Sequence, residues 1–159
     1  MTKRIVQVVV SSSILLLLCA PPMSAQEAKK AAPKDLFPHA CVDCHLVTPE
    51  GDLRFGPMIK RWATKVEGKS LAAAKAAAPK GMTIKGKHPA MASLKDVPAA
   101  CLKCHGATSK IAPPLAPIVH LVHLGADSQF VKKFAGDCKH CHKLDPARGV
   151  LAVPSAPEK

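Results

Sequence analysis

The chain has 159 residues and a formal net charge of +12, and aromatic residues make up only 3% of it. Much of its 48% hydrophobic content is alanine, so the polypeptide alone buries too little surface to offset its chain entropy. No Ser-His-Asp set, phosphate-binding glycine loop or carboxylate pair stands out among its 11 acidic residues, which argues against hydrolytic and general acid-base chemistry.

The N-terminus predicts a secretory signal peptide over residues 1–25. Lys3 and Arg4 give a positive start, and residues 5–18 are largely apolar and carry no charge. A membrane anchor is the alternative, but this run is shorter than the ~20 residues that span a bilayer. Cys19 is expected to be removed with the signal. Loss of Lys3 and Arg4 lowers the formal net charge from +12 to about +10.

The exported part is expected to form one domain between two loose ends. Its composition predicts a flexible leader over residues 26–36, a domain over 37–149 and a flexible tail over 150–159. Residues 58–66 are amphiphilic, with apolar side chains four apart, and residues 69–78 have high helix propensity. Fifteen prolines and the lack of a period-two pattern argue against long helices and a regular sheet.

All six cysteines of the exported part fall into three units of the form Cys-x-x-Cys-His. The units are CVDCH at 41–45, CLKCH at 101–105 and CKHCH at 138–142. Disulfide bonds, the usual staples of an exported protein, place no demand on the residue after the second cysteine. Zinc sites combine such pairs in even number or with histidines in finger spacing. A thioredoxin-like redox motif is expected once, on a βαβ framework that this sequence lacks.

Covalent haem attachment accounts for every element of the unit. Two cysteines three apart form thioethers to the two vinyl groups of one haem, and the adjacent histidine binds the iron. The sequence therefore predicts three c-type haems. The covalent anchors are Cys41, Cys44, Cys101, Cys104, Cys138 and Cys141, and the proximal iron ligands are His45, His105 and His142.

Three haems also change the expected fold. Their apolar macrocycles replace the missing aromatic side chains, so we expect a mainly α fold with extensive irregular structure and little or no β-sheet. In this fold a few short helices wrap around stacked haems. Each haem carries two propionates, which lower the formal charge from about +10 to about +4 and make a nucleic-acid role unnecessary.

Five histidines remain for the sixth position of the three irons: His39, His88, His120, His123 and His140. His120 and His123 lie three apart, so on a helix they project from adjacent turns toward two different irons. His88 lies 13 residues before Cys101 and is assigned to the second haem or to the first. These three histidines are the candidate distal ligands.

The other two histidines and three methionines are competing candidates. His39 is too close to its own motif to reach over its own haem, so it reaches a neighbouring haem or lies at the surface. His140 lies between two anchor cysteines and is expected to be solvated or bonded to a propionate, with distal ligation of another haem as the alternative. A His/Met site at Met58, Met82 or Met91 would raise the potential of that haem.

The stretch HLVHL at 120–124, followed by CKHCH, resembles the class III multihaem cytochromes c, which are trihaem and tetrahaem periplasmic proteins of sulfate- and metal-reducing bacteria. The resemblance covers roughly residues 118–145. It implies that His120 serves the haem on Cys138 and Cys141, and that His123 serves one of the others. Some fifty residues without cysteine follow the first motif, an interval longer than in the compact family members.

A surplus of histidines favours electron transfer, because an iron with two histidine ligands has no site for a substrate. We expect a bacterial electron carrier of the periplasm or cell surface, not an enzyme, without a nucleic-acid partner and without a transmembrane anchor after signal removal. Its partners are expected to be redox proteins with acidic docking surfaces. The lysines expected to steer them are Lys103, Lys132, Lys133, Lys139 and Lys143.

Two alternatives to the carrier stay open. One is a reductase with one open-coordinate haem, or the subunit through which electrons enter such an enzyme. The other is a protomer of a haem-lined filament, in which a spare histidine such as His39 ligates a haem of the next protomer.

Overall fold

The structure, a computed structural model, describes residues 34–91 and 94–159. The expected signal peptide, Cys19 and most of the expected leader lie outside these residues. The described residues belong to one unit, Lys34–Lys159.

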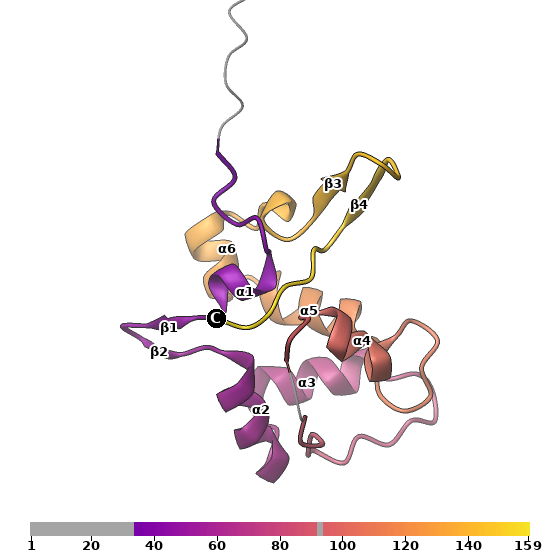
Figure 1. Cartoon of the computed structure of the whole chain (residues 1–159). Helices are drawn as coiled ribbons and strands as arrows, with labels where there is room; N and C mark the ends of the chain where they lie inside the picture. Colours follow the sequence, from indigo (N-terminus) through magenta and orange to yellow (C-terminus); the bar gives the residue numbers. More distant parts are fainter. Residues whose placement is uncertain (1–33, 92–93) are drawn as a thin grey trace, which may run out of the picture. The chain divides into compact units, whose positions relative to one another are not determined.

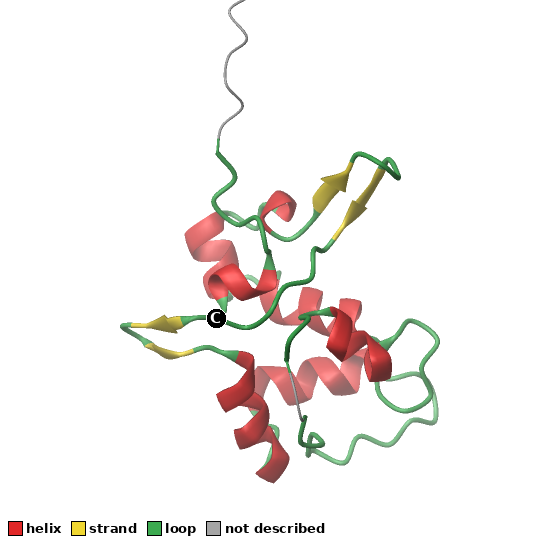
Figure 2. Cartoon of the chain, viewed as in Figure 1, coloured by secondary structure: helices red, strands yellow, loops and turns green. Residues whose placement is uncertain are grey.

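Short helices and two small hairpins supply the regular structure, and loops connect them (Figures 1 and 2). The elements in chain order are α1 (Cys41–Cys44), β1 (Val47–Thr48), β2 (Gly51–Asp52), α2 (Phe55–Thr64), α3 (Gly68–Ala77), α4 (Ala99–His105), α5 (Leu115–His123), α6 (Gln129–Phe134), the 3-10 turn η1 (Cys138–His140), β3 (Lys143–Asp145) and β4 (Val150–Ala152). Strand β1 pairs with β2 and β3 with β4, both antiparallel. The mainly helical fold with little β-sheet confirms that part of the sequence prediction.

Helices α2 and α3 occupy the two segments for which the sequence indicates helix. Ile59 is the buried residue of α2, and Ala73 is the buried residue of α3. Helix α3 ends at Ala77 because Pro79 follows, and Ala78 takes the extended conformation that a residue before proline favours. Helix α3 packs against α5, so the alanine-rich helix backs the helix that carries two of the candidate ligands.

The hydrophobic core is small and lies beside the first two motifs. Val42, Val97 and Ala156 form it, with 0%, 1% and 7% of their surface exposed. The partly buried side chains packed against it are Cys41, Phe55, Leu94 and Cys101. Since two of these four are motif cysteines, the first and second motifs meet at this core.

Large apolar side chains lie mainly outside the core. Those with about half or more of their surface exposed are Leu36, Val47, Leu53, Leu102, Ile111, Leu121, Leu124, Leu144, Val150 and Leu151. Among the described residues, the buried hydrophobic positions include three alanines: Ala40, Ala73 and Ala156. The polypeptide therefore leaves much apolar surface uncovered by its own chain.

Residues 150–159, for which the sequence predicts a flexible tail, make defined contacts. Val97 and Ala156 exchange backbone hydrogen bonds of 2.8 and 3.0 Å. Both carboxylate oxygens of Glu158 accept from the backbone N–H of Gly56 at 3.0 Å, and the ammonium of Lys159 binds Asp43. The structural unit therefore extends past residue 149. The contacts are made by backbone and charged groups, which leave no apolar pattern in the sequence.

Candidate metal centres

Each Cys-x-x-Cys-His unit forms one turn of helix. In the first unit the backbone N–H of His45 donates to the carbonyl of Cys41 at 3.0 Å, and in the third His142 donates to Cys138 at 2.8 Å. The second unit forms the C-terminal part of α4. Residues three and four apart in such a turn lie on one face. The local fold therefore brings both cysteines and the histidine of each unit to the same side.

The six motif cysteines are free thiols in the structure. Burial raises the pKa of Cys41 to about 11, and the nearby Cys141 adds to this effect. Burial also raises the pKa of Cys44, Cys101 and Cys141. A thiol used for redox exchange has a lowered pKa. These four thiols are shifted the other way, because burial disfavours the charged thiolate. Cys141 of the third motif lies near enough to Cys41 of the first motif to contribute to the raised pKa of Cys41.

Every motif histidine lies opposite one histidine from outside the motifs. The ring centres are 6.1 Å apart for His45 and His123, 5.9 Å for His105 and His88, and 6.1 Å for His142 and His120. The ring planes make angles of 60°, 8° and 47° in the same order. The three partners are the three histidines that the sequence nominates as distal ligands.

This spacing fits a metal ion between the two rings of each pair. A histidine nitrogen lies about 2 Å from a transition metal such as zinc that it binds, and the ring centre lies about 1 Å further away. Two imidazoles on opposite sides of one ion therefore have ring centres about 6 Å apart. Directly packed rings in this chain span the same range, from 4.0 Å for His45 and Phe55 to 6.1 Å for Phe130 and His140, so the spacing fits a ligand pair without being specific to one.

Backbone carbonyls hold four of the six rings by their Nδ1 atoms. Nδ1 of His45 lies 2.8 Å from the backbone oxygen of Leu53, and Nδ1 of His105 lies 2.6 Å from that of Pro113. Nδ1 of His88 lies 2.7 Å from the backbone oxygen of Pro89, and Nδ1 of His123 lies 2.9 Å from that of Val119. An Nδ1–H that donates to a carbonyl leaves Nε2 with its lone pair, which is the atom that then binds metal. Burial also lowers the pKa of His45 and so favours its neutral form.

Helix α5 presents His120 and His123 from adjacent turns, and the two rings meet different motif histidines as their spacing indicates. Ser128 fixes the end of this helix, because its hydroxyl donates to the carbonyl of His123 and accepts from the N–H of Val131 at 3.0 Å. Ser128 is the N-cap of α6, a position at which serine is favoured. Ser128 therefore fixes the turn that follows the helix carrying both candidate ligands.

Helix α2 positions His88, a role that its sequence did not suggest. The backbone N–H of His88 donates to the carbonyl of Trp62 at 2.9 Å, and Val66 donates to Gly86 at 2.8 Å. The rings of Trp62 and His88 are 6.3 Å apart. The amphiphilic pattern over residues 58–66 extends past the helix, which ends at Thr64, because Val66 pairs with the loop that carries His88.

His39 and His140 are not opposite a motif histidine in the structure. The backbone N–H of His39 donates to Asp43 at 2.6 Å, and its Nδ1 lies 3.4 Å from the same carboxylate. Burial opposes ionisation of Asp43, but hydrogen bonds from Lys159 and His39 outweigh it and hold the pKa of Asp43 below its usual value. His39 itself is half exposed.

His140 is part of an aromatic cluster and keeps part of its surface exposed. Its ring centre is 4.8 Å from that of Phe37, 5.4 Å from Phe134 and 6.1 Å from Phe130. Phe130 also contacts His123 edge-on at 6.0 Å. The cluster joins the start of the unit, α6 and the third motif. Only the four-residue interval between Phe130 and Phe134 could have indicated part of it from the sequence.

In the ranges 34–91 and 94–159, no group of three or more His, Cys, Asp or Glu side chains is arranged to hold a metal ion. The candidate ligands in these ranges are the three histidine pairs. None of the helices in these ranges has the length and apolar character needed to span a bilayer.

The chain was compared with protein-family models, with curated proteins and with solved structures, and none of them matches it.

Proposed function

We propose that this protein is an exported trihaem c-type cytochrome that carries electrons between redox partners in the periplasm or at the cell surface. One observation carries the proposal. Three motif histidines each lie 5.9–6.1 Å from a different non-motif histidine, the separation expected for two ligands on one iron. On the basis of these pairs we assign His123 to the haem of the first motif, His88 to that of the second and His120 to that of the third.

When bound, each haem supplies an iron that gains or loses one electron. The chain's residues hold that iron in a fixed environment. The cysteines would anchor the haem, and the two histidines of each pair would ligate its iron, so neither water nor substrate would be needed as a ligand. Backbone carbonyls fix the ring orientation of His45, His88, His105 and His123.

The protein surface supports the same proposal. The small core and the ten exposed large apolar side chains leave apolar area that three macrocycles would cover. Helix α5 carries one ligand for the first centre and one for the third, on adjacent turns, so these two centres are neighbours. Neighbouring centres allow an electron accepted at one to move to the next within the protein.

Carbon monoxide distinguishes the carrier from a reductase with an open haem. We expect the reduced, haem-loaded protein to show almost no fast change in its absorption spectrum on addition of carbon monoxide, because histidine occupies both axial positions of every iron. Rapid binding to one haem or more would favour the reductase. Light scattering on the same sample tests the filament, since a monomer with three six-coordinate haems excludes ligation by His39 of a second copy.

A further inference from the structure

The stretch that leads into α2 contacts the ring of His45 in two ways. Nδ1 of His45 lies 2.8 Å from the backbone oxygen of Leu53, and the ring of Phe55 stacks on the imidazole with centres 4.0 Å apart and planes at 18°. Among the described residues, Phe55 is the ring closest to any motif histidine. Residues 53–55 therefore fix the orientation of the candidate proximal ligand of the first motif.

Helix α2 begins at Phe55 without a local cap. Arg54, the N-cap residue, makes no side-chain capping bond, and the first turn contains no acidic side chain. The first N–H groups of a helix have no partner within the helix and need an acceptor from elsewhere. Pro57 has no N–H to satisfy. The N–H of Gly56 therefore depends on an acceptor outside the helix.

Glu158 supplies this acceptor from 102 residues further along the chain. Both of its carboxylate oxygens lie 3.0 Å from the backbone nitrogen of Gly56, and a negative charge at this end of a helix is favourable. A side-chain carbon at position 56 would lie 3.1 Å from Oε2 of Glu158, so glycine leaves the room that the carboxylate occupies. The N–H of Glu158 donates to the carbonyl of Leu94 at 3.2 Å, which fixes the position of the acceptor.

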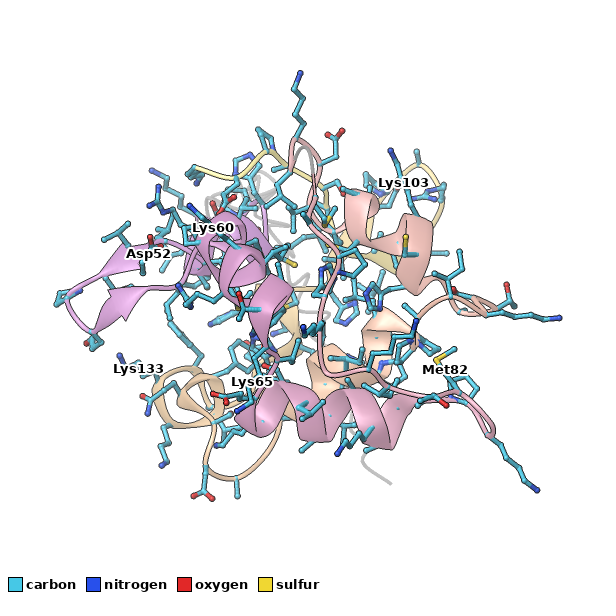
Figure 3. All side chains as sticks on the ribbon, turned by 90° about the horizontal axis from the view of Figure 1, so that it is seen from below. Asp52, Lys60, Lys65, Met82, Lys103 and Lys133 are labelled. Carbon is cyan, nitrogen blue, oxygen red and sulfur yellow. The ribbon has the colours of Figure 1, made fainter. Side chains whose placement is uncertain are left out.

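The same residues at the end of the chain also lie near the first motif. Burial lowers the pKa of His45, and the charge of Glu158 is one of the influences that oppose this effect. The ammonium of Lys159 binds Asp43, which lies between the two cysteines of the motif. Figure 3 shows Asp52 and Lys60, which flank residues 53–59 in the chain, on the same side of the view.

We propose that Glu158 is a positioning residue for the first candidate centre: its carboxylate caps α2, and the capped helix keeps Phe55 stacked on His45. This inference rests on the proposed function. Glu158 acts through Gly56 and Phe55. Groups that orient an axial histidine tune the metal that the histidine binds, so a loosened ring changes the low-spin spectrum of that haem alone.

Low-temperature electron paramagnetic resonance of the haem-loaded protein tests this role. In Glu158→Ala, which removes the acceptor, about one third of the low-spin ferric signal is expected to move to new g values, because one haem of three is affected. Phe55→Leu should move the same signal, and the combined variant should add little to either single one. In a protein that lacks the first haem through Cys41→Ser/Cys44→Ser, Glu158→Ala should change no signal.

Two further variants separate positioning from the loss of a charge. Glu158→Gln keeps an acceptor oxygen but loses the charge, so it should leave the signal in place. Glu67→Ala is the matched control, because this carboxylate pairs with Lys65 and makes no side-chain capping bond to α3. Hydrogen exchange of the Gly56 N–H should be about tenfold faster in Glu158→Ala and unchanged in the control.

Equal effects of Glu158→Ala and Glu158→Gln would overturn the proposal, since charge alone would then act on the haem. A lower thermal midpoint in Glu158→Ala with all three low-spin signals in place would also overturn it, because Glu158 would then only stabilise the fold. Unchanged signals in Phe55→Leu contradict it even where Glu158→Ala does not fold. A lack of three haem masses or of low-spin signals in the unchanged protein counts against the proposed function instead.

Discussion

The double variant Cys101→Ser/Cys104→Ser is expected to lose one of three haems. Serine cannot form a thioether, so the haem of the second motif has no covalent anchor and is not retained after denaturation. Intact mass should fall by one haem beyond the change in side chains, and the haem absorbance of the denatured protein by about one third. The same substitutions at 41 and 44, or at 138 and 141, should each remove one haem.

Cys19→Ser is the matched control for these variants. Cys19 lies in the expected signal peptide, so the mass of the exported protein should not change at all. Retention of three haem masses in any of the double variants would contradict the assignment of one haem to each motif. A partial loss at all motifs together would indicate a folding defect, and circular dichroism of the variant checks for it.

Replacing a distal histidine is expected to convert one iron from low spin to high spin. His88→Ala, His120→Ala and His123→Ala each remove one axial ligand from one pair, so each variant should bind carbon monoxide at one haem of three. His39→Ala and His140→Ala are the controls, because neither ring lies opposite a motif histidine. High-spin iron in either control variant would contradict the ligand assignment.

The pairing itself is tested by combining the two kinds of variant. In a protein that already lacks the haem of the second motif, His88→Ala should produce no further high-spin iron, because the iron that His88 serves is absent. His123→Ala in the same background should still produce it, since His123 lies opposite His45. If His88→Ala produces high-spin iron in this background and His123→Ala does not, then His88 serves the haem of the first motif and His123 that of the second.

The candidate centres could be predicted from the sequence because the residues of each motif lie within five positions of one another. The Cys-x-x-Cys-His units each specify two anchors and one ligand within a single turn of helix, so nothing distant is needed to recognise them. The three-residue interval between His120 and His123 likewise predicts two rings on adjacent turns of one helix. In the structure the ring centre of His120 lies 6.1 Å from that of His142.

Contacts between segments that are far apart in the sequence could not be predicted from local spacing. The rings of His45 and His123 lie 6.1 Å apart although the two residues are far apart in the sequence, and the backbone N–H of His88 donates to the carbonyl of Trp62 in α2. The pairing of Val97 with Ala156 is a single isolated bridge, too short to give a strand pattern. His140 lies among phenylalanines from two separate segments. The backbone hydrogen bonds of Val97 and His88 do not depend on side-chain type, so they left no signal in the sequence. The ring contacts join residues that are far apart in the sequence, so they gave no periodic pattern either.

The most direct test of three bis-histidine haems is one sample measured in two ways, by intact mass and by low-temperature electron paramagnetic resonance. The protein is expressed in a host competent for c-type haem attachment. We predict the mass of residues 26–159 plus three haems, with only low-spin ferric signals. A protein that carries no haem, or three haems of which one or more is high-spin in the unchanged sequence, would contradict the account.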